Sequence, residues 1–326
     1  MLYIGDRIKL NGPSIVDVSL IKEIVKCQDI NLDFLQANSR RDLIKTIFCL
    51  YQYDIIHVSA VSFGGLVIVL LAYLGNKKSF FLAHGLLKAE KRYRKIKWLR
   101  LFEEIVILKL STYVLVVSDQ LKQLTLQQYD LKPAKVLTQY NGINFDIIRP
   151  SKRMTAKNEP ISFVTVGGGR PEKGVLKLCE AIEMFSEVNI ELFVVGEVGD
   201  HIDKIKGYNF VNYLGFISQN QLIELLFKTD FFIQNSHYEP FGMAPLEAVI
   251  AGCNIIVSKK TGFLTILDLS EDYWICDPAD TNSIHKAIIS TLKKPNNTAV
   301  LGMLISKKEE LSWSNRGRQL INRWKG

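Results

Sequence analysis

The chain has 326 residues, of which 48% are hydrophobic and 23% charged, a balance typical of a globular protein that excludes a disordered one. Its formal net charge of +8 is uneven: residues 1–150 hold 21 Lys and Arg against 13 Asp and Glu, while residues 151–326 hold 20 of each. A basic half favours an anionic partner, which is a nucleic acid, an anionic membrane surface or a phosphorylated substrate.

In the first half, short β-type runs alternate with helical runs. The predicted strands cover residues 1–4, 30–35, 54–59, 79–83, 113–117 and 136–140. The predicted helices cover residues 15–27, 42–50, 65–74 and 94–110. Such alternation predicts a parallel sheet covered by helices on both faces.

The same alternation restarts after residues 150–160, a polar stretch with a proline at each end that is the best candidate for a linker. The predicted strands of this second half cover residues 161–166, 191–195, 211–214, 230–234, 254–257 and 273–275. We therefore expect two Rossmann-like α/β domains, residues 1–150 and residues 151–326.

Neither the cysteines nor the apolar runs indicate a secreted or membrane-spanning chain. The five cysteines form no C-x-x-C pair and have no His at metal-ligand spacing, which favours reduced thiols in a cytoplasmic protein. The start of the chain is charged too early for a signal peptide. The longest apolar run, residues 65–74, is well short of the roughly 20 residues that span a bilayer, and we expect it to be a buried helix.

The most informative stretch is residues 239–247, in which Glu239 and Glu247 flank a Phe-Gly turn between two predicted strands. Strand, loop, helix and strand in this order bind a nucleotide diphosphate in a doubly wound sheet. Pro245 suits the first turn of a helix, which would place Glu247 in that turn, where the helix dipole favours a carboxylate. On spacing alone, however, two solvated charges at a helix start are the simpler interpretation.

The flanking residues favour a functional role. Residues 236–252 resemble the E-x7-E signature of family 4 of the retaining, nucleotide-sugar-dependent glycosyltransferases. These have the GT-B fold, in which two Rossmann-like domains face each other across a cleft. The resemblance implies that Glu247 holds the ribose of the donor and that Glu239 contacts the transferred sugar. It also implies that backbone N–H groups face the donor sugar and phosphate at Phe241, Gly242 and Met243.

A second motif is the glycine-rich run at residues 166–174, between a predicted strand and a predicted helix. Arg170 and Lys173 supply positive charge where a diphosphate would lie. An ordinary glycine-rich surface turn is the alternative. The run resembles the family's G-R-L-x-P-E-K-G motif, in which Lys173 matches directly. Gly168 occupies the position of the family's usual arginine, so Arg170 is the weaker candidate.

Two further candidates lie in the first half. His84 follows a predicted strand, where open α/β sheets bind ligands, and it resembles the family's histidine near the transferred sugar. Gly12 lies in the first strand–helix loop, where the family commonly has a Gly-Gly turn that approaches the diphosphate. His57 ends a similar strand, and we interpret it as structural. Near the C-terminus, residues 311–324 resemble the final helix of the fold, which crosses back to the first domain.

Residues 88–102 carry seven Lys and Arg, with Tyr93, Trp98 and Phe102 among them. One interpretation is docking onto anionic lipid headgroups, with the aromatic side chains inserted at the interface. The other is a solvated helix face with core aromatic residues on its back. A nucleic-acid role is disfavoured because the chain shows no nucleic-acid module.

We therefore predict a metal-independent, retaining glycosyltransferase with catalytic residues His84 and Glu239. The sequence has no D-x-D triplet for a metal, so we expect no cofactor and a nucleotide diphosphate sugar as co-substrate. The expected acceptor is a glycan, lipid-linked as in cell-surface polysaccharide or lipopolysaccharide assembly, at the inner face of the cytoplasmic membrane. A sugar-nucleotide 2-epimerase and a non-catalytic sugar-nucleotide-binding subunit remain the alternatives.

Overall fold

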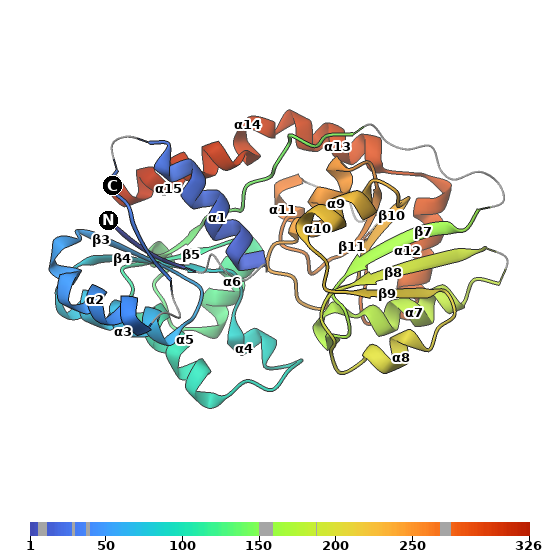
Figure 1. The fold of residues 1–326 in the computed structure, drawn as a ribbon. Helices are drawn as coiled ribbons and strands as arrows, with labels where there is room; N and C mark the ends of the chain where they lie inside the picture. Colours follow the sequence, from blue (N-terminus) through green and yellow to red (C-terminus); the bar gives the residue numbers. More distant parts are fainter. Residues whose placement is uncertain (6–11, 28–29, 37–39, 150–158, 187, 268–274) are drawn as a thin grey trace. The chain divides into compact units, whose positions relative to one another are not determined.

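The computed structural model describes residues 1–5, 12–27, 30–36, 40–149, 159–186, 188–267 and 275–326. The chain divides into two compact units, one of residues 1–142 and 309–326 and the other of residues 143–308. Each unit contains a six-stranded sheet in which all of the described strand pairs are parallel (Figure 1). Both are Rossmann-like α/β units, as the sequence predicts.

In the first unit the strand order is β2-β1-β3-β4-β5-β6. The strands are β1 (Leu2–Gly5), β2 (Asp33–Gln36), β3 (Ile55–Ser59), β4 (Lys78–Ala83), β5 (Tyr113–Val116) and β6 (Val136–Thr138). The chain moves outward from β1 to β2 and then returns to the other side of β1 with β3. This reversal is the topological switch point, where the carboxyl ends of strands leave room for a ligand.

Helices cover both faces of this sheet (Figure 1). Its helices are α1 (Gly12–Val25), α2 (Arg40–Cys49), α3 (Phe63–Leu74), α4 (Leu87–Glu90), α5 (Trp98–Leu110), α6 (Asp119–Gln128) and α15 (Trp313–Lys325), with 3-10 turns η1 (Leu50–Gln52) and η2 (Pro133–Lys135). The terminal helix α15 packs against α1, and Trp324 on it is buried. The approach is close because a Cβ at Gly317 would lie 2.9 Å from Glu23 Cβ.

In the second unit the strand order is β12-β11-β10-β7-β8-β9, with the switch point between β7 and β10. The strands are β7 (Ile161–Val166), β8 (Ile190–Val195), β9 (Val211–Gly215), β10 (Phe231–Gln234), β11 (Asn254–Ser258) and β12 (Ile275–Cys276). The helices are α7 (Val175–Glu183), α8 (Ile202–Lys206), α9 (Gln219–Leu226), α10 (Met243–Ile250), α11 (Leu264–Leu267), α12 (Thr281–Lys293) and α13 (Asn297–Ser306), with the 3-10 turn η3 (Pro171–Lys173) before α7 and the short α14 (Lys308–Leu311) at the boundary.

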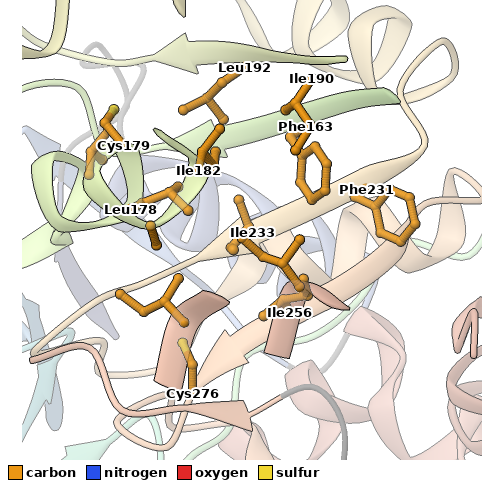
Figure 2. Close-up of a cluster of buried hydrophobic side chains, with 14 of the residues drawn as sticks. Phe163, Leu178, Cys179, Ile182, Ile190, Leu192, Phe231, Ile233, Ile256 and Cys276 are labelled. Carbon is orange, nitrogen blue, oxygen red and sulfur yellow. The ribbon is translucent and has the colours of Figure 1, made fainter. Parts of the chain in front are cut away.

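A cluster of buried apolar side chains packs α7 against this second sheet (Figure 2). Leu178 and Ile182 of α7 lie over Phe163, Phe231 and other inward-facing strand residues, and all four are at most 2% exposed. The Phe163 and Phe231 rings stack with centroids 4.9 Å apart. Burying each such side chain is worth roughly 1.5–3 kcal/mol, so the core holds the strand ends that carry the candidate site.

The boundary between the units differs from the expected one at residue 150. Residues 143–149 belong to the second unit, because the Arg149 N–H donates to Ile250 O (2.9 Å) and its guanidinium lies 3.7 Å from the Phe227 ring centroid. The proposed linker, residues 150–160, lies almost wholly outside the described residues.

The long helix predicted at residues 94–110 was also wrong in part, because α5 begins only at Trp98. The Glu104 side chain accepts hydrogen bonds from the Leu87 and Lys88 N–H groups (2.6 and 3.0 Å), which makes α4 a separate turn. The cations between the two helices would repel one another at helical spacing, which disfavours a continuous helix.

Candidate functional site

In the second unit, the glycine-rich run and the E-x7-E stretch are held together at the switch point. Gly174 has a left-handed backbone (φ 62°), and a Cβ there would lie 2.2 Å from Asn235 O in the loop after β10. Glycine is therefore required for these two loops to approach so closely.

This approach brings together two residues that the sequence singled out separately. Lys173 Nζ lies 2.7 Å from Glu239 Oε2, and Gln234 Nε2 donates to the same oxygen at 2.6 Å. The two charged side chains are only 14% and 13% exposed. Lys173 is thus paired with a carboxylate and does not stand as an isolated cation.

The loop of Glu239 is fixed by its backbone. Glu239 forms a parallel bridge with Thr261, and the Gly262 N–H donates to Glu239 O at 3.0 Å. Gly242 has a left-handed backbone (φ 95°), and a Cβ there would lie 2.7 Å from Thr261 Cγ2. The buried Phe241 accepts a hydrogen bond from the Phe263 N–H (2.9 Å).

Gly242 is the N-cap of α10, and no side chain of the described residues caps this helix. The first N–H groups of a helix have no partner within it, so Gly242 and Met243 lie where an anion or sugar oxygen could be bound. The family resemblance implies a donor-binding role for these N–H groups, and that role stays a prediction.

Glu247, in contrast, is not in the first turn. The helix begins at Met243, two residues before Pro245, so Glu247 is its fifth residue. Pro245 is tolerated at the third position because its missing N–H is one of the unpaired groups. Burial raises the pKa of the Glu247 carboxyl, while a hydrogen bond with Gln219 lowers it. The helix dipole therefore does not govern this charge, since its effect is confined to the first turn.

The remaining two residues predicted to bind the sugar donor, Arg170 and Gly12, are less constrained by contacts with other residues. Arg170 is 39% exposed, with Nη1 3.7 Å from Glu172 Oε1 and Nε donating to Gly167 O at 3.3 Å. Gly12 is the exposed first residue of α1, and nothing among the described atoms lies within 4 Å of a Cβ placed there. Packing within the described part of the chain gives no reason for a glycine at position 12.

In the first unit, His84 follows β4 and belongs to a buried polar cluster that the sequence did not reveal. Ser59 Oγ lies 2.8 Å from His84 Nε2 and donates to Asp17 Oδ1 at 2.5 Å. Tyr3 OH donates to the same Asp17 oxygen at 2.8 Å. A signal was present, because Asp17 shares the buried face of α1 with Leu20 and Ile21.

Burial lowers the pKa of His84, and the nearby Asp17 carboxylate opposes the shift. His57 lies between Tyr3 and Trp324, with ring centroids 4.4 and 5.5 Å away. It is fully buried, and neither of its ring nitrogens has a hydrogen-bond partner among the described residues. Burial lowers its pKa to about 3, so His57 is a neutral core residue, in agreement with its structural interpretation.

The basic segment at residues 88–102 exposes two of its three aromatic residues, whereas Tyr93 is half-buried. Trp98 is 76% exposed and Phe102 is 51% exposed, so the alternative that they are core residues is wrong. The neighbouring α3 exposes a second apolar set: Phe63, Leu70, Tyr73 and Leu74. Within the described ranges, no helix combines the length and the apolar character needed to cross a membrane.

Two family models match almost the whole chain. The model of glycosyl transferases group 1 matches residues 148–309, and that of glycosyltransferase family 4 matches residues 21–147.

Curated relatives have low sequence identity to this chain, and the two described here are both named as glycosyltransferases. An uncharacterized glycosyltransferase of Methanocaldococcus jannaschii is 27% identical over 66% of the chain and 61% of its own length. The UDP-Gal:alpha-D-GlcNAc-diphosphoundecaprenol alpha-1,3-galactosyltransferase of Escherichia coli is 22% identical over 76% of the chain and 70% of its own length. The chain thus spans roughly two thirds of these relatives.

Among solved structures, Anabaena HepE in complex with UDP and glucose superposes with a TM-score of 0.77 at 14% identity, covering 99% of this chain and 98% of that one. At this identity the likeness shows the shared fold.

Proposed function

The chain belongs to the glycosyl transferases group 1 with the GT-B fold, and from that premise we propose that it is a retaining, metal-independent transferase of a hexosyl group from a nucleotide diphosphate sugar. The observation that carries the proposal is the joining of Lys173 and Glu239 beside the uncapped start of α10. It supplies a cation, a carboxylate and the N–H groups of a helix start within one unit.

Each group has a role in this proposal. The α10 N-terminus, Lys173 and Arg170 bind the diphosphate and stabilise its negative charge as it departs, and such electrostatic stabilisation contributes most of the rate enhancement in many enzymes. Glu247 accepts hydrogen bonds from the ribose hydroxyls. Glu239 and His84 contact the transferred sugar, and the diphosphate competes with Glu239 for Lys173.

We further propose that the acceptor is a glycan on a lipid carrier. The Escherichia coli relative is named for an acceptor on diphosphoundecaprenol, which is a polyprenyl lipid. An enzyme that acts on such an acceptor must reach the bilayer surface. The chain would then act at the inner, cytoplasmic face of the membrane.

The segment at residues 88–102 provides the means of approach. Lys91, Arg92, Arg94 and Lys95 are exposed, and Trp98 and Phe102 are exposed one helical turn apart on α5. Each cation near an anionic surface contributes about 1 kcal/mol, and the aromatic rings suit the headgroup layer. Together they would hold the protein on anionic lipid without a spanning helix.

The catalytic proposal is tested by release of nucleotide diphosphate from a donor with and without a glycan acceptor. A glycosyltransferase releases the nucleotide in proportion to product and only when acceptor is present, apart from slow hydrolysis. A 2-epimerase instead changes the sugar of the donor without acceptor, and a non-catalytic subunit binds the donor unchanged. A thermal-shift screen of UDP-, GDP-, ADP- and dTDP-sugars selects the donor beforehand, because binding stabilises the fold.

The membrane proposal is tested by co-sedimentation with anionic and neutral vesicles at rising salt. Changing Lys91, Arg92, Arg94 and Lys95 to Gln should abolish most binding, while changing Lys204 and Lys206 of α8 to Gln should not. Wild-type binding should fall as salt rises, because salt screens exposed charges. Failure of the wild type to bind anionic vesicles at low salt would overturn the proposal.

A further inference from the structure

The polar cluster around His84 bears on the protonation of its imidazole ring as well as on the position of the ring. Four polar side chains from separate parts of the first unit meet there: Tyr3 on β1, Asp17 on α1, Ser59 at the end of β3 and His84 after β4. Tyr3, Asp17 and Ser59 are each at most 2% exposed. Buried polar groups are costly unless they are hydrogen-bonded, so each of these side chains needs a hydrogen-bond partner within the cluster.

The direction of these hydrogen bonds follows from counting protons. Asp17 Oδ1 faces two hydroxyl groups, Tyr3 OH at 2.8 Å and Ser59 Oγ at 2.5 Å. An ionised carboxylate can only accept, so each hydroxyl gives its single proton to Asp17. Ser59 then has no proton left for His84, and the 2.8 Å contact between Ser59 Oγ and His84 Nε2 must use a proton on the histidine.

We propose that Asp17 and Ser59 are positioning residues that hold His84 in the tautomer with its proton on Nε2, leaving Nδ1 as a hydrogen-bond acceptor for a hydroxyl of the transferred sugar. The role of Nδ1 rests on the proposed function, whereas the tautomer does not. Burial also keeps the ring neutral by lowering its pKa. When the single proton of a neutral histidine is fixed on Nε2, Nδ1 can only accept a hydrogen bond. It therefore binds a group that donates, such as a hydroxyl, and not a group that only accepts.

The backbone is built around this arrangement. A Cβ at Gly5, the last residue of β1, would lie 2.5 Å from Asp17 Oδ2. Only glycine therefore leaves room for the carboxylate at this strand end. Gly5→Ala should displace the Asp17 carboxylate although Asp17, Ser59 and His84 are all still present. It is therefore a second way to break the hydrogen bonds that link Asp17, Ser59 and His84.

The test is nitrogen NMR of histidine-labelled protein, with the His84 signals assigned by their loss in His84→Gln. The wild type should carry its proton on Nε2. Ser59→Ala and Gly5→Ala should both give a mixture of tautomers. Ser62→Ala is the matched control: Ser62 Oγ caps α3 by accepting from the Gly65 N–H at 3.0 Å, so this variant should lose stability but keep the tautomer.

Activity adds a second readout. In Ser59→Ala we expect kcat to fall about tenfold with donor affinity nearly unchanged, in line with one lost hydrogen bond in the transition state. A proton on Nδ1 in the wild type, or an unchanged tautomer in Ser59→Ala, would overturn the proposal. If the tautomer behaves as expected but no donor is turned over, the proposed function fails and the positioning role stands.

Discussion

Lys173 and Glu239 form an ion pair that joins the glycine-rich loop after β7 to the loop after β10, with 2.7 Å between Nζ and Oε2. Because both side chains are about 14% exposed or less, neither charge is well solvated alone. The pair therefore holds the two loops together, and each partner depends on the other.

Lys173→Met should lower the free energy of unfolding by about 2 kcal/mol, since it leaves the Glu239 charge poorly compensated. The double variant Lys173→Met with Glu239→Gln should recover part of that loss, as measured by urea unfolding in a double-mutant cycle. Lys177→Met is the control, because the Lys177–Glu180 pair is equally short at 2.6 Å but 39% and 38% exposed. Equal losses in the two lysine variants would show that burial of the Lys173 pair is unimportant.

Glu247→Gln should weaken binding of the donor by roughly 1.5–3 kcal/mol, because it removes a charged acceptor for the ribose hydroxyls. Burial raises the pKa of this carboxyl, so in the wild type the charged form is lost at a higher pH than for an ordinary glutamate. Donor affinity should accordingly begin to fall at a higher pH than it would with a glutamate of ordinary pKa, and this fall should be absent in Glu247→Gln. Calorimetry with a nucleotide sugar measures both effects.

The exposed Glu224 on α9 supplies a control in Glu224→Gln, which should bind the donor like the wild type. Unchanged donor affinity in a folded Glu247→Gln protein would remove Glu247 from the site.

The sequence predicted the two sheets because their strands are buried apolar runs whose type and order are set locally. Residues 161–166, for example, were expected to form a strand and do so as β7. The start of α10 was less predictable, because the left-handed Gly242 is imposed by contacts with Thr261 and Phe263, about twenty residues away. Local helix rules placed Pro245 and Glu247 together in the first turn, whereas the helix begins at Met243, so that Pro245 is its third residue and Glu247 its fifth.

The cluster of Asp17, Ser59 and His84 could not be predicted for a related reason. Asp17 and Ser59 are 42 residues apart, and they meet only because β1 and β3 are neighbours across the switch point. The break between α4 and α5 likewise depends on Glu104, 17 residues from the N–H group of Leu87 that it binds. Contacts of this kind follow from topology, which a linear pattern does not encode.

Gly174→Ala should cost at least 2 kcal/mol more stability than Gly215→Ala, combining backbone strain with an overpacked contact. The two glycines share a left-handed backbone, with φ 62° and 67°. They differ in their surroundings, because a Cβ at Gly215 meets nothing within 4 Å of the described atoms, whereas one at Gly174 meets Asn235 O. Thermal unfolding of the two variants isolates the contact, and equal losses would contradict the close approach of the loops.

Transfer should persist in excess EDTA, because Lys173, Arg170 and the start of α10 supply the positive potential that a departing diphosphate requires. The assay compares initial rates with purified donor before and after chelation. Complete loss of activity that magnesium or manganese restores would show that the diphosphate is held by a metal instead.

His57→Phe should make the protein more resistant to acid. The His57 pKa is lowered from 6.5 in the unfolded chain to about 3 in the fold, so the unfolded state binds the extra proton over that range. The contribution of this group to stability is complete above pH 6.5 and declines as the pH falls toward 3. In the wild type, this group should lower the free energy of unfolding by about 2 kcal/mol between pH 6.5 and pH 5.

Phenylalanine keeps the stack on Tyr3 and the edge contact with Trp324, and it removes two buried nitrogens that have no partner among the described residues. The variant should therefore be at least as stable as the wild type at pH 7, and the pH dependence due to this residue should vanish. Urea unfolding at pH 7, 6 and 5 measures both effects. Parallel pH profiles for the wild type and His57→Phe would show that His57 is not forced to remain neutral.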